Sequence, residues 1–310
     1  MISRFTLAAV FTGACLAADS QMEGPKLGFI YDPQASAIRP ILGIPGAALF
    51  GQPLTSTLQR AVVSPSQDFA IGVSGDESAV SILNLTNGEV QPLAVAKPAP
   101  SRIVFSPNGS AVVFLHGASA QIFTGLPAAP TAGGEYDLPA DPQSIALSDD
   151  GSLLLAAVSE SDASALYSYS SNGAAHRILA AGRISSIQFL NRSHDAIFAD
   201  AIENKIILLR EGADATAVAS LDQPTAVTAS ADNHKLFAAS AAAKSITAIS
   251  LDDGSSVSTS CNCEPDALAP LQGGATFRIT GIGDGPTWIF DTNGAEARVL
   301  FIPHVGAGNE

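Results

Sequence analysis

A repeat of about 40 residues runs through this chain and constrains its fold more than any other feature. Six segments share one layout, in which a short β-rich run is followed by a polar turn and a second β-rich run. The residues that open these turns are Ser64, Ser106, Ser148, Leu190, Ser230 and Leu271. They are 42, 42, 42, 40 and 41 residues apart, and a period this regular indicates one supersecondary unit used many times.

Each segment is followed by a third β-rich run, and four of these runs end in residue pairs typical of tight turns. The pairs are Asn87-Gly88, Asn172-Gly173, Asp253-Gly254 and Asn293-Gly294. Such pairs adopt positive φ at low cost and connect the strands of a hairpin, so a fourth antiparallel strand should follow. Helical periodicity is nowhere sustained. Four antiparallel strands every forty-odd residues are typical of a β-propeller blade, and we predict an all-β fold of this kind.

The period also predicts the number of blades. Extending it backwards from Ser64 reaches Met22, which gives seven repeats and therefore a seven-bladed β-propeller of four-stranded antiparallel blades. We expect one domain over residues 22–306 because no linker is long enough to divide it. Its blades should start near residues 22, 55, 101, 143, 184, 224 and 266.

The first blade differs from the others in its expected strands. Residues 27–31, 37–43 and 47–54 match the second, third and fourth strands of a blade. The stretch before them, DSQMEGPK, is a poor strand, so we expect the first blade to be incomplete on its inner side. Residues 297–303 should form the last outer strand and pack against the first blade.

Two of the turns resemble those of a known superfamily. Ser106-Pro107-Asn108-Gly109 and Ser148-Asp149-Asp150-Gly151 look like the Ser-Pro-Asp-Gly turns of secreted seven-bladed propellers of the YVTN and NHL type. As a repeat pattern, the resemblance covers nearly the whole chain after the N-terminal segment. The superfamily includes binding modules, lactonases, lyases and quinone-dependent enzymes, so the resemblance implies a fold and leaves the function open.

Residues 1–17 are predicted to be an export signal. Arg4 is followed by an apolar run that ends near Leu16, and small residues stand where a signal peptidase would cut. Cleavage after Ala17 would release a secreted or periplasmic protein without a transmembrane segment. In the alternative, Cys15 would carry a lipid after Thr12-Gly13-Ala14 and anchor the protein to the envelope.

The charge of the chain limits its partners. It has 29 acidic and 15 basic residues, for a formal net charge of −14. Such a chain repels phosphate backbones, so we expect no nucleic acid as partner. We expect a monomer that binds a protein or a small molecule.

Acidic residues are frequent in the loops expected on one face of the propeller. This face holds the loops from each second strand to the third and from each blade to the next, and it is the usual ligand face. The candidate binding residues there are Asp32, Asp76, Glu77, Glu160, Asp162, Asp200, Glu203 and Asp284. We expect them to make an acidic channel mouth. No cofactor is predicted, but calcium or another divalent cation is an alternative occupant.

His116 is the one histidine expected on this face, since His194 and His234 fall in turns of the opposite face. A propeller hydrolase, lactonase or lyase would need such a general base near the axis, with a carboxylate or a metal beside it. The sequence has none of the common hydrolase, metalloprotease or nucleotide-binding fingerprints. We therefore expect a non-enzymatic binding module. An enzyme with His116 as its base and an envelope-anchored structural protein remain the alternatives.

Cys261 and Cys263 are separated by one residue in the connection from the sixth blade to the seventh. Because exported proteins meet oxidising conditions, we predict that they form a disulfide at the channel mouth. Metal binding, free thiols and pairing with another chain are the alternatives.

Overall fold

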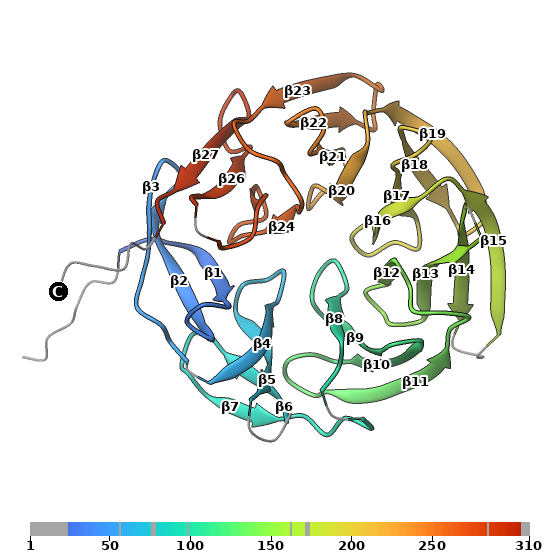
Figure 1. Cartoon of the computed structure of the whole chain (residues 1–310). Helices are drawn as coiled ribbons and strands as arrows, with labels where there is room; N and C mark the ends of the chain where they lie inside the picture. Colours follow the sequence, from blue (N-terminus) through green and yellow to red (C-terminus); the bar gives the residue numbers. More distant parts are fainter. Residues whose placement is uncertain are drawn as a thin grey trace, which may run out of the picture.

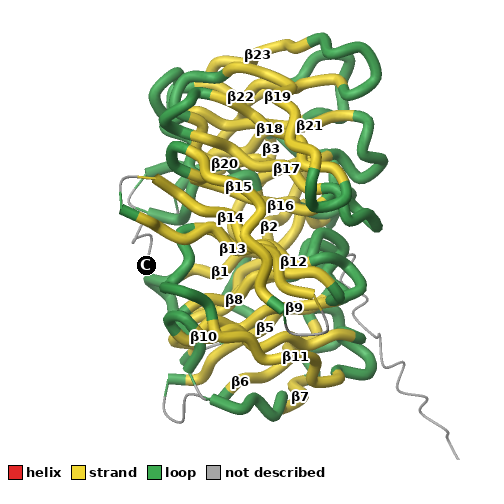
Figure 2. Tube along the Cα trace, turned by 90° about the vertical axis from the view of Figure 1, so that its right-hand side faces the viewer, coloured by secondary structure: helices red, strands yellow, loops and turns green. Residues whose placement is uncertain are grey.

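The computed structural model describes residues 24–55, 57–75, 79–97, 99–161, 163–170, 174–283 and 285–304. These ranges contain 27 β-strands and no helix, and therefore no helix that could cross a membrane. The strands form seven antiparallel sheets arranged as a ring around a central axis (Figure 1). Seen from the edge of the ring, the loops gather on its two faces (Figure 2). The prediction of an all-β, seven-bladed propeller is confirmed.

The first sheet has three described strands, and the others have four in chain order. Blade one consists of β1 (Lys26–Asp32), β2 (Ala37–Ile44) and β3 (Ala47–Phe50). Blade two consists of β4 (Leu58–Val63), β5 (Phe69–Ser74), β6 (Val80–Asn84) and β7 (Val90–Pro92). Blade three consists of β8 (Arg102–Phe105), β9 (Ala111–His116), β10 (Ser119–Thr124) and β11 (Thr131–Asp137). Blade four consists of β12 (Ser144–Leu147), β13 (Leu153–Glu160), β14 (Ala163–Ser170) and β15 (Ala175–Ala181).

The remaining three blades complete the ring. Blade five consists of β16 (Ile184–Phe189), β17 (Ala196–Asp200), β18 (Lys205–Arg210) and β19 (Asp214–Ser220). Blade six consists of β20 (Pro224–Ala229), β21 (Lys235–Ser240), β22 (Ser245–Ser250) and β23 (Ser256–Ser260). Blade seven consists of β24 (Ala269–Pro270), β25 (Thr276–Arg278), β26 (Thr287–Asp291) and β27 (Arg298–Ile302). β27 contacts β3 of blade one, which closes the ring (Figure 1).

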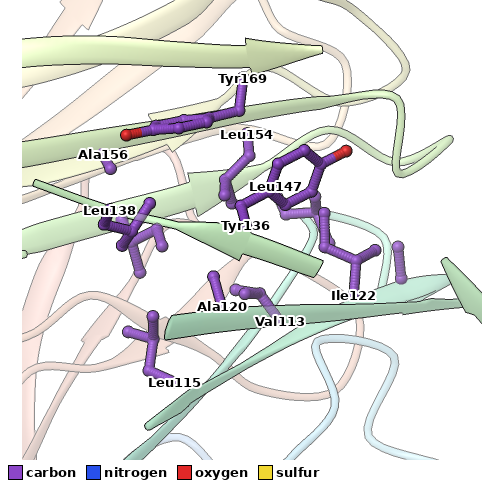
Figure 3. Packing of buried hydrophobic residues seen from close by; sticks show 12 residues of the cluster. Val113, Leu115, Ala120, Ile122, Tyr136, Leu138, Leu147, Leu154, Ala156 and Tyr169 are labelled. Carbon is purple, nitrogen blue, oxygen red and sulfur yellow. The ribbon is translucent and has the colours of Figure 1, made fainter. Parts of the chain in front are cut away.

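Seven hydrophobic clusters hold the blades together, one between each neighbouring pair. The cluster between blades three and four includes Tyr136 and Tyr169, whose rings lie 5.7 Å apart and pack with Leu147 and Leu154 (Figure 3). Middle strands are buried on both faces because each lies between two other blades, which explains continuous apolar runs such as AVVFL in β9. Outer strands such as β19 are mostly exposed and contain small or polar residues.

The turns between the first and second strands share a backbone feature. In five of the six aligned turns, the third residue after the opening residue has a positive φ. These residues are Gln67, Gly109, Gly151, Asn233 and Gly274. Glycine and asparagine are ordinary at such positions, whereas glutamine is strained there, with a φ of 64°. Gln67 therefore has a structural task that offsets this strain.

That task is to join three blades at the inner edge of β1, the innermost strand described for blade one. The side-chain Oε1 of Gln67 accepts a hydrogen bond of 2.6 Å from the Phe29 backbone N–H on β1. Its Nε2 donates to the Pro270 carbonyl on β24, at 2.9 Å. β1 is the innermost strand described for blade one, so this amide satisfies a backbone group at its inner edge.

Candidate functional site

A cavity of about 700 Å³ follows the axis of the ring and is lined by residues from all seven blades. Most of its lining side chains are apolar or small. Examples from different blades are Phe29, Val62, Phe105, Leu147, Ile187 and Leu268. Its volume and apolar character are those of pockets that hold a small molecule. We call this cavity the axial channel.

Several polar side chains of the channel wall form hydrogen bonds to backbone carbonyl groups of the protein. The Tyr31 hydroxyl lies 2.9 Å from the carbonyl oxygens of Leu58 and Gln59. Ser185 Oγ donates to the Pro224 carbonyl at 2.6 Å, and Thr225 Oγ1 donates to the Pro265 carbonyl at 2.8 Å. These bonds connect each blade to the next, so the groups stabilise the ring.

In blades two and three, arginine side chains make the same kind of contact to the next blade. Arg60 donates to the carbonyls of Pro100 and Ser101, just before the first strand of blade three. Arg102 likewise donates to the carbonyls that precede the first strand of blade four, and it also pairs with Asp141 at 3.2 Å. Arg60 and Arg102 are thus each bound to the backbone of the adjacent blade.

Arg278 differs from these groups because its described side-chain hydrogen bond stays within its own blade. It ends β25 and lines the cavity, and its Nη1 donates to the Thr280 carbonyl at 2.7 Å. Within the described residues this is its one side-chain hydrogen bond, and no carboxylate lies at ion-pair distance. Burial of the guanidinium lowers the pKa of Arg278, which the charge of Asp266 opposes.

Two of the predicted mouth carboxylates, Asp32 and Asp200, are buried in the loops that they begin. Asp32 accepts two backbone N–H groups and pairs with Arg39 Nε at 2.7 Å. Asp200 accepts the N–H groups of Gly182, Arg183, Ile202 and Glu203 at 2.7 to 3.1 Å. Burial alone would raise the pKa of Asp200, but these four donors lower it below its ordinary value.

Two others, Glu160 and Glu203, lie at the surface in ion pairs. Glu160 accepts the Tyr167 hydroxyl and pairs with Arg177 at 3.0 Å, and these contacts, that of Tyr167 first, lower the pKa of Glu160. Glu203 pairs with Lys205 at 3.3 Å. Neither lines the axial channel. Asp76, Glu77, Asp162 and Asp284, like the signal segment 1–17 with Cys15, lie outside the described residues.

His116 ends β9, and it is not among the residues that line the channel. Its Nε2 lies 2.9 Å from the Lys97 carbonyl oxygen, to which it donates a hydrogen bond. Nδ1 is then the nitrogen left to accept a proton. In the described part of the chain, no three His, Cys, Asp or Glu side chains come together as a metal site.

Cys261 and Cys263 are joined by a disulfide, with their Cα atoms 5.2 Å apart. Both are only 8% exposed and pack with Leu268, Phe277 and Phe290 in the cluster between blades six and seven. They do not line the axial channel. The disulfide thus lies in the connection from blade six to blade seven and packs into the interface between these blades, not at the channel.

Arg278 is not among the site residues predicted from the sequence, although the repeat contains a signal for it. Seven residues after the opening residue of each turn, the other five segments have Ile71, Val113, Leu155, Ile197 and Phe237. All five are buried and apolar. A charged residue at a core position of a repeat marks a site whose surroundings differ from those in the other blades.

No family model matches the chain, and no curated protein matches it. Solved structures share its fold. A protein of unknown function from Desulfotomaculum acetoxidans has a TM-score of 0.60 at 13% identity, over 90% of this chain and 100% of that one. A proposed 6-phosphogluconolactonase from Bacteroides fragilis has a TM-score of 0.59 at 15% identity, over 89% and 92%.

Virginiamycin B lyase from Staphylococcus aureus has a TM-score of 0.54 at 15% identity, over 91% of this chain and 96% of that one. At such identities a likeness establishes the fold alone. Since these neighbours include a lyase, the fold is compatible with catalysis as well as with binding. By its strands, its sheet order and these likenesses, the chain is a seven-bladed β-propeller.

Proposed function

We propose that this chain is an exported, non-enzymatic binding module that holds a small molecule in its axial channel, entered from the acidic mouth face. The observation that supports this is the cavity of about 700 Å³, lined mainly by apolar side chains of all seven blades. Burial of an apolar ligand there gains roughly 25 cal/mol per Å² of surface removed from water. The preformed wall limits the entropy lost on binding.

The positions of the candidate catalytic groups favour binding over catalysis. A general base must reach the proton that it abstracts, directly or through one water molecule. His116 lies outside the channel wall, and Asp32 and Asp200 are engaged with backbone N–H groups. Among the described residues of the wall, the one carboxylate is Asp266, which is exposed.

The test uses N-phenyl-1-naphthylamine, an uncharged dye that fluoresces when it enters an apolar site. We expect saturable binding to the purified protein. Gln188→Trp should weaken this binding roughly tenfold, equivalent to about 1.4 kcal/mol. Gln188 lines the channel, and its side chain has no hydrogen bond among the described residues. A tryptophan there would place an indole ring in the space for the dye.

Thr216→Trp is the matched control, because it adds the same ring to the exposed outer strand β19 of the same blade. It should bind the dye as the wild type does. If the wild type fails to bind the dye, or if both variants bind it equally well, the channel is not a ligand site.

A further inference from the structure

We infer that Arg278 makes the axial channel selective for amphiphilic anions, in which an apolar body carries one carboxylate or similar oxyanion. This inference rests on the proposed function, and it names the chemical class of the ligand.

The place of Arg278 in the repeat explains why its side chain reaches the channel. The equivalent residues in the other blades, such as Val113 and Phe237, pack in the clusters toward the next blade along the chain. For blade seven the next blade is blade one, in which β1 is the innermost described strand. The channel is lined at this point by β1 residues together with Arg278 and Ile282.

Within the described residues, the guanidinium of Arg278 has unused hydrogen-bonding capacity. It carries five N–H donors in a planar fork, and one of them binds the Thr280 carbonyl. A guanidinium in an apolar cavity is costly unless its charge and its donors are matched. A carboxylate matches both, because its two oxygens can accept parallel hydrogen bonds from the fork.

Among the described charged residues of the channel wall, Arg278 is the one that can pair with an anion. Among the described residues of the wall, it is the one basic side chain, and Asp266 is the one acidic side chain. Asp266 is exposed, and its charge acts on Arg278 without a described ion pair between the two side chains. The apolar wall formed by Ile145, Ile187 and Leu268 would contact the remainder of the ligand.

The experiment compares three probes that share one alkyl chain and differ in charge. Octanoate, 1-octanol and octyltrimethylammonium are each used to displace N-phenyl-1-naphthylamine from the protein at neutral pH. We expect octanoate to displace the dye at a concentration about tenfold below that of octanol, as a charge-assisted hydrogen bond allows. Octyltrimethylammonium should be the weakest, because its charge repels the guanidinium.

Variants at Arg278 then test whether this residue causes the preference for octanoate. Arg278→Gln should lose the advantage of octanoate over octanol and leave displacement by octanol unchanged. Arg278→Lys, which keeps the charge and loses the fork, should retain part of that advantage. Arg177→Gln is the matched control, because it removes an exposed arginine of outer strand β15 that pairs with Glu160, and it should bind all three probes as the wild type does.

The outcomes separate this inference from the proposed function. If the dye binds but octanoate and octanol displace it equally, or if octyltrimethylammonium is the strongest, the anion preference is wrong and the binding module stands. The same holds if Arg278→Gln weakens all three probes alike, because Arg278 would then shape the channel without selecting charge. If the dye does not bind, the proposed function fails first.

Discussion

Buried carboxylates in the loops of this propeller organise the backbone around them. Asp32 and Asp200 end equivalent strands, and each accepts the N–H groups of the residues two and three positions further on. This is the turn that aspartate commonly starts. In the sequence, such a residue cannot be distinguished from a carboxylate that binds a ligand. Only the buried N–H groups around it distinguish the two, and those of Gly182 and Arg183 come from a different loop.

We expect Asp200→Asn to lower the free energy of unfolding by about 2 kcal/mol at pH 7, because the amide would turn an N–H toward a backbone donor. The pKa of Asp200 is lowered in the folded protein, so its carboxylate stabilises the fold above the unfolded pKa of roughly 3.9. That stability is lost as the pH falls through the folded pKa. Urea unfolding at several pH values should show the variant and the wild type converging below about pH 4.

The exposed Glu203 serves as the control for this measurement. Glu203→Gln removes a surface ion pair with Lys205 and should change the stability by less than about 0.5 kcal/mol. A deficit in Asp200→Asn that is equally large at pH 3 and pH 7 would contradict the role of the ionised carboxylate.

At the scale of elements, turn chemistry and strand spacing make most of the blades predictable from sequence. The third β-rich run expected in each repeat corresponds to the third strand of a blade, as in β18 and β26, because each is a β-rich segment flanked by turn residues. Gln67 has a role that the sequence pattern does not predict. It occupies an ordinary turn, yet its side chain reaches Pro270, 203 residues away, and local patterns contain no information about such a contact.

Two substitutions separate the bridging role of Gln67 from its backbone strain. Gln67→Ala removes the bonds to Phe29 and Pro270 and keeps the strain of positive φ, so it should lose about 2 kcal/mol of stability. Gln67→Gly also removes the bonds but relieves roughly 1 kcal/mol of strain, so it should lose less. Urea unfolding followed by circular dichroism measures both. A Gln67→Gly protein more stable than the wild type would show that the bridge contributes nothing.

The whole molecule depends on the closure between its first and last blades. The cluster at this junction joins Ile41 and Ala48 of blade one to Ile289 and Ile302 of blade seven. The sequence predicts the closing strand within residues 297–303, and β27 occupies Arg298–Ile302. It does not predict that Arg278 lines the channel, because that depends on how the first blade meets the last one. The fold was therefore more accessible from sequence than the candidate site.

If closure makes the ring one cooperative unit, damage at this junction should destabilise every blade together. Ile302 is fully buried, so Ile302→Ala should cost about 3 kcal/mol, whereas Phe301→Ala, at a residue 54% exposed, should cost less than about 1 kcal/mol. Trp288, the single tryptophan, lies in blade seven, so its fluorescence reports locally while far-UV circular dichroism reports on all blades. In a cooperative ring both signals have the same urea midpoint, and Ile302→Ala lowers the two equally. A fluorescence midpoint below that of the circular dichroism would mean that blade seven opens first and that closure is not what unites the ring.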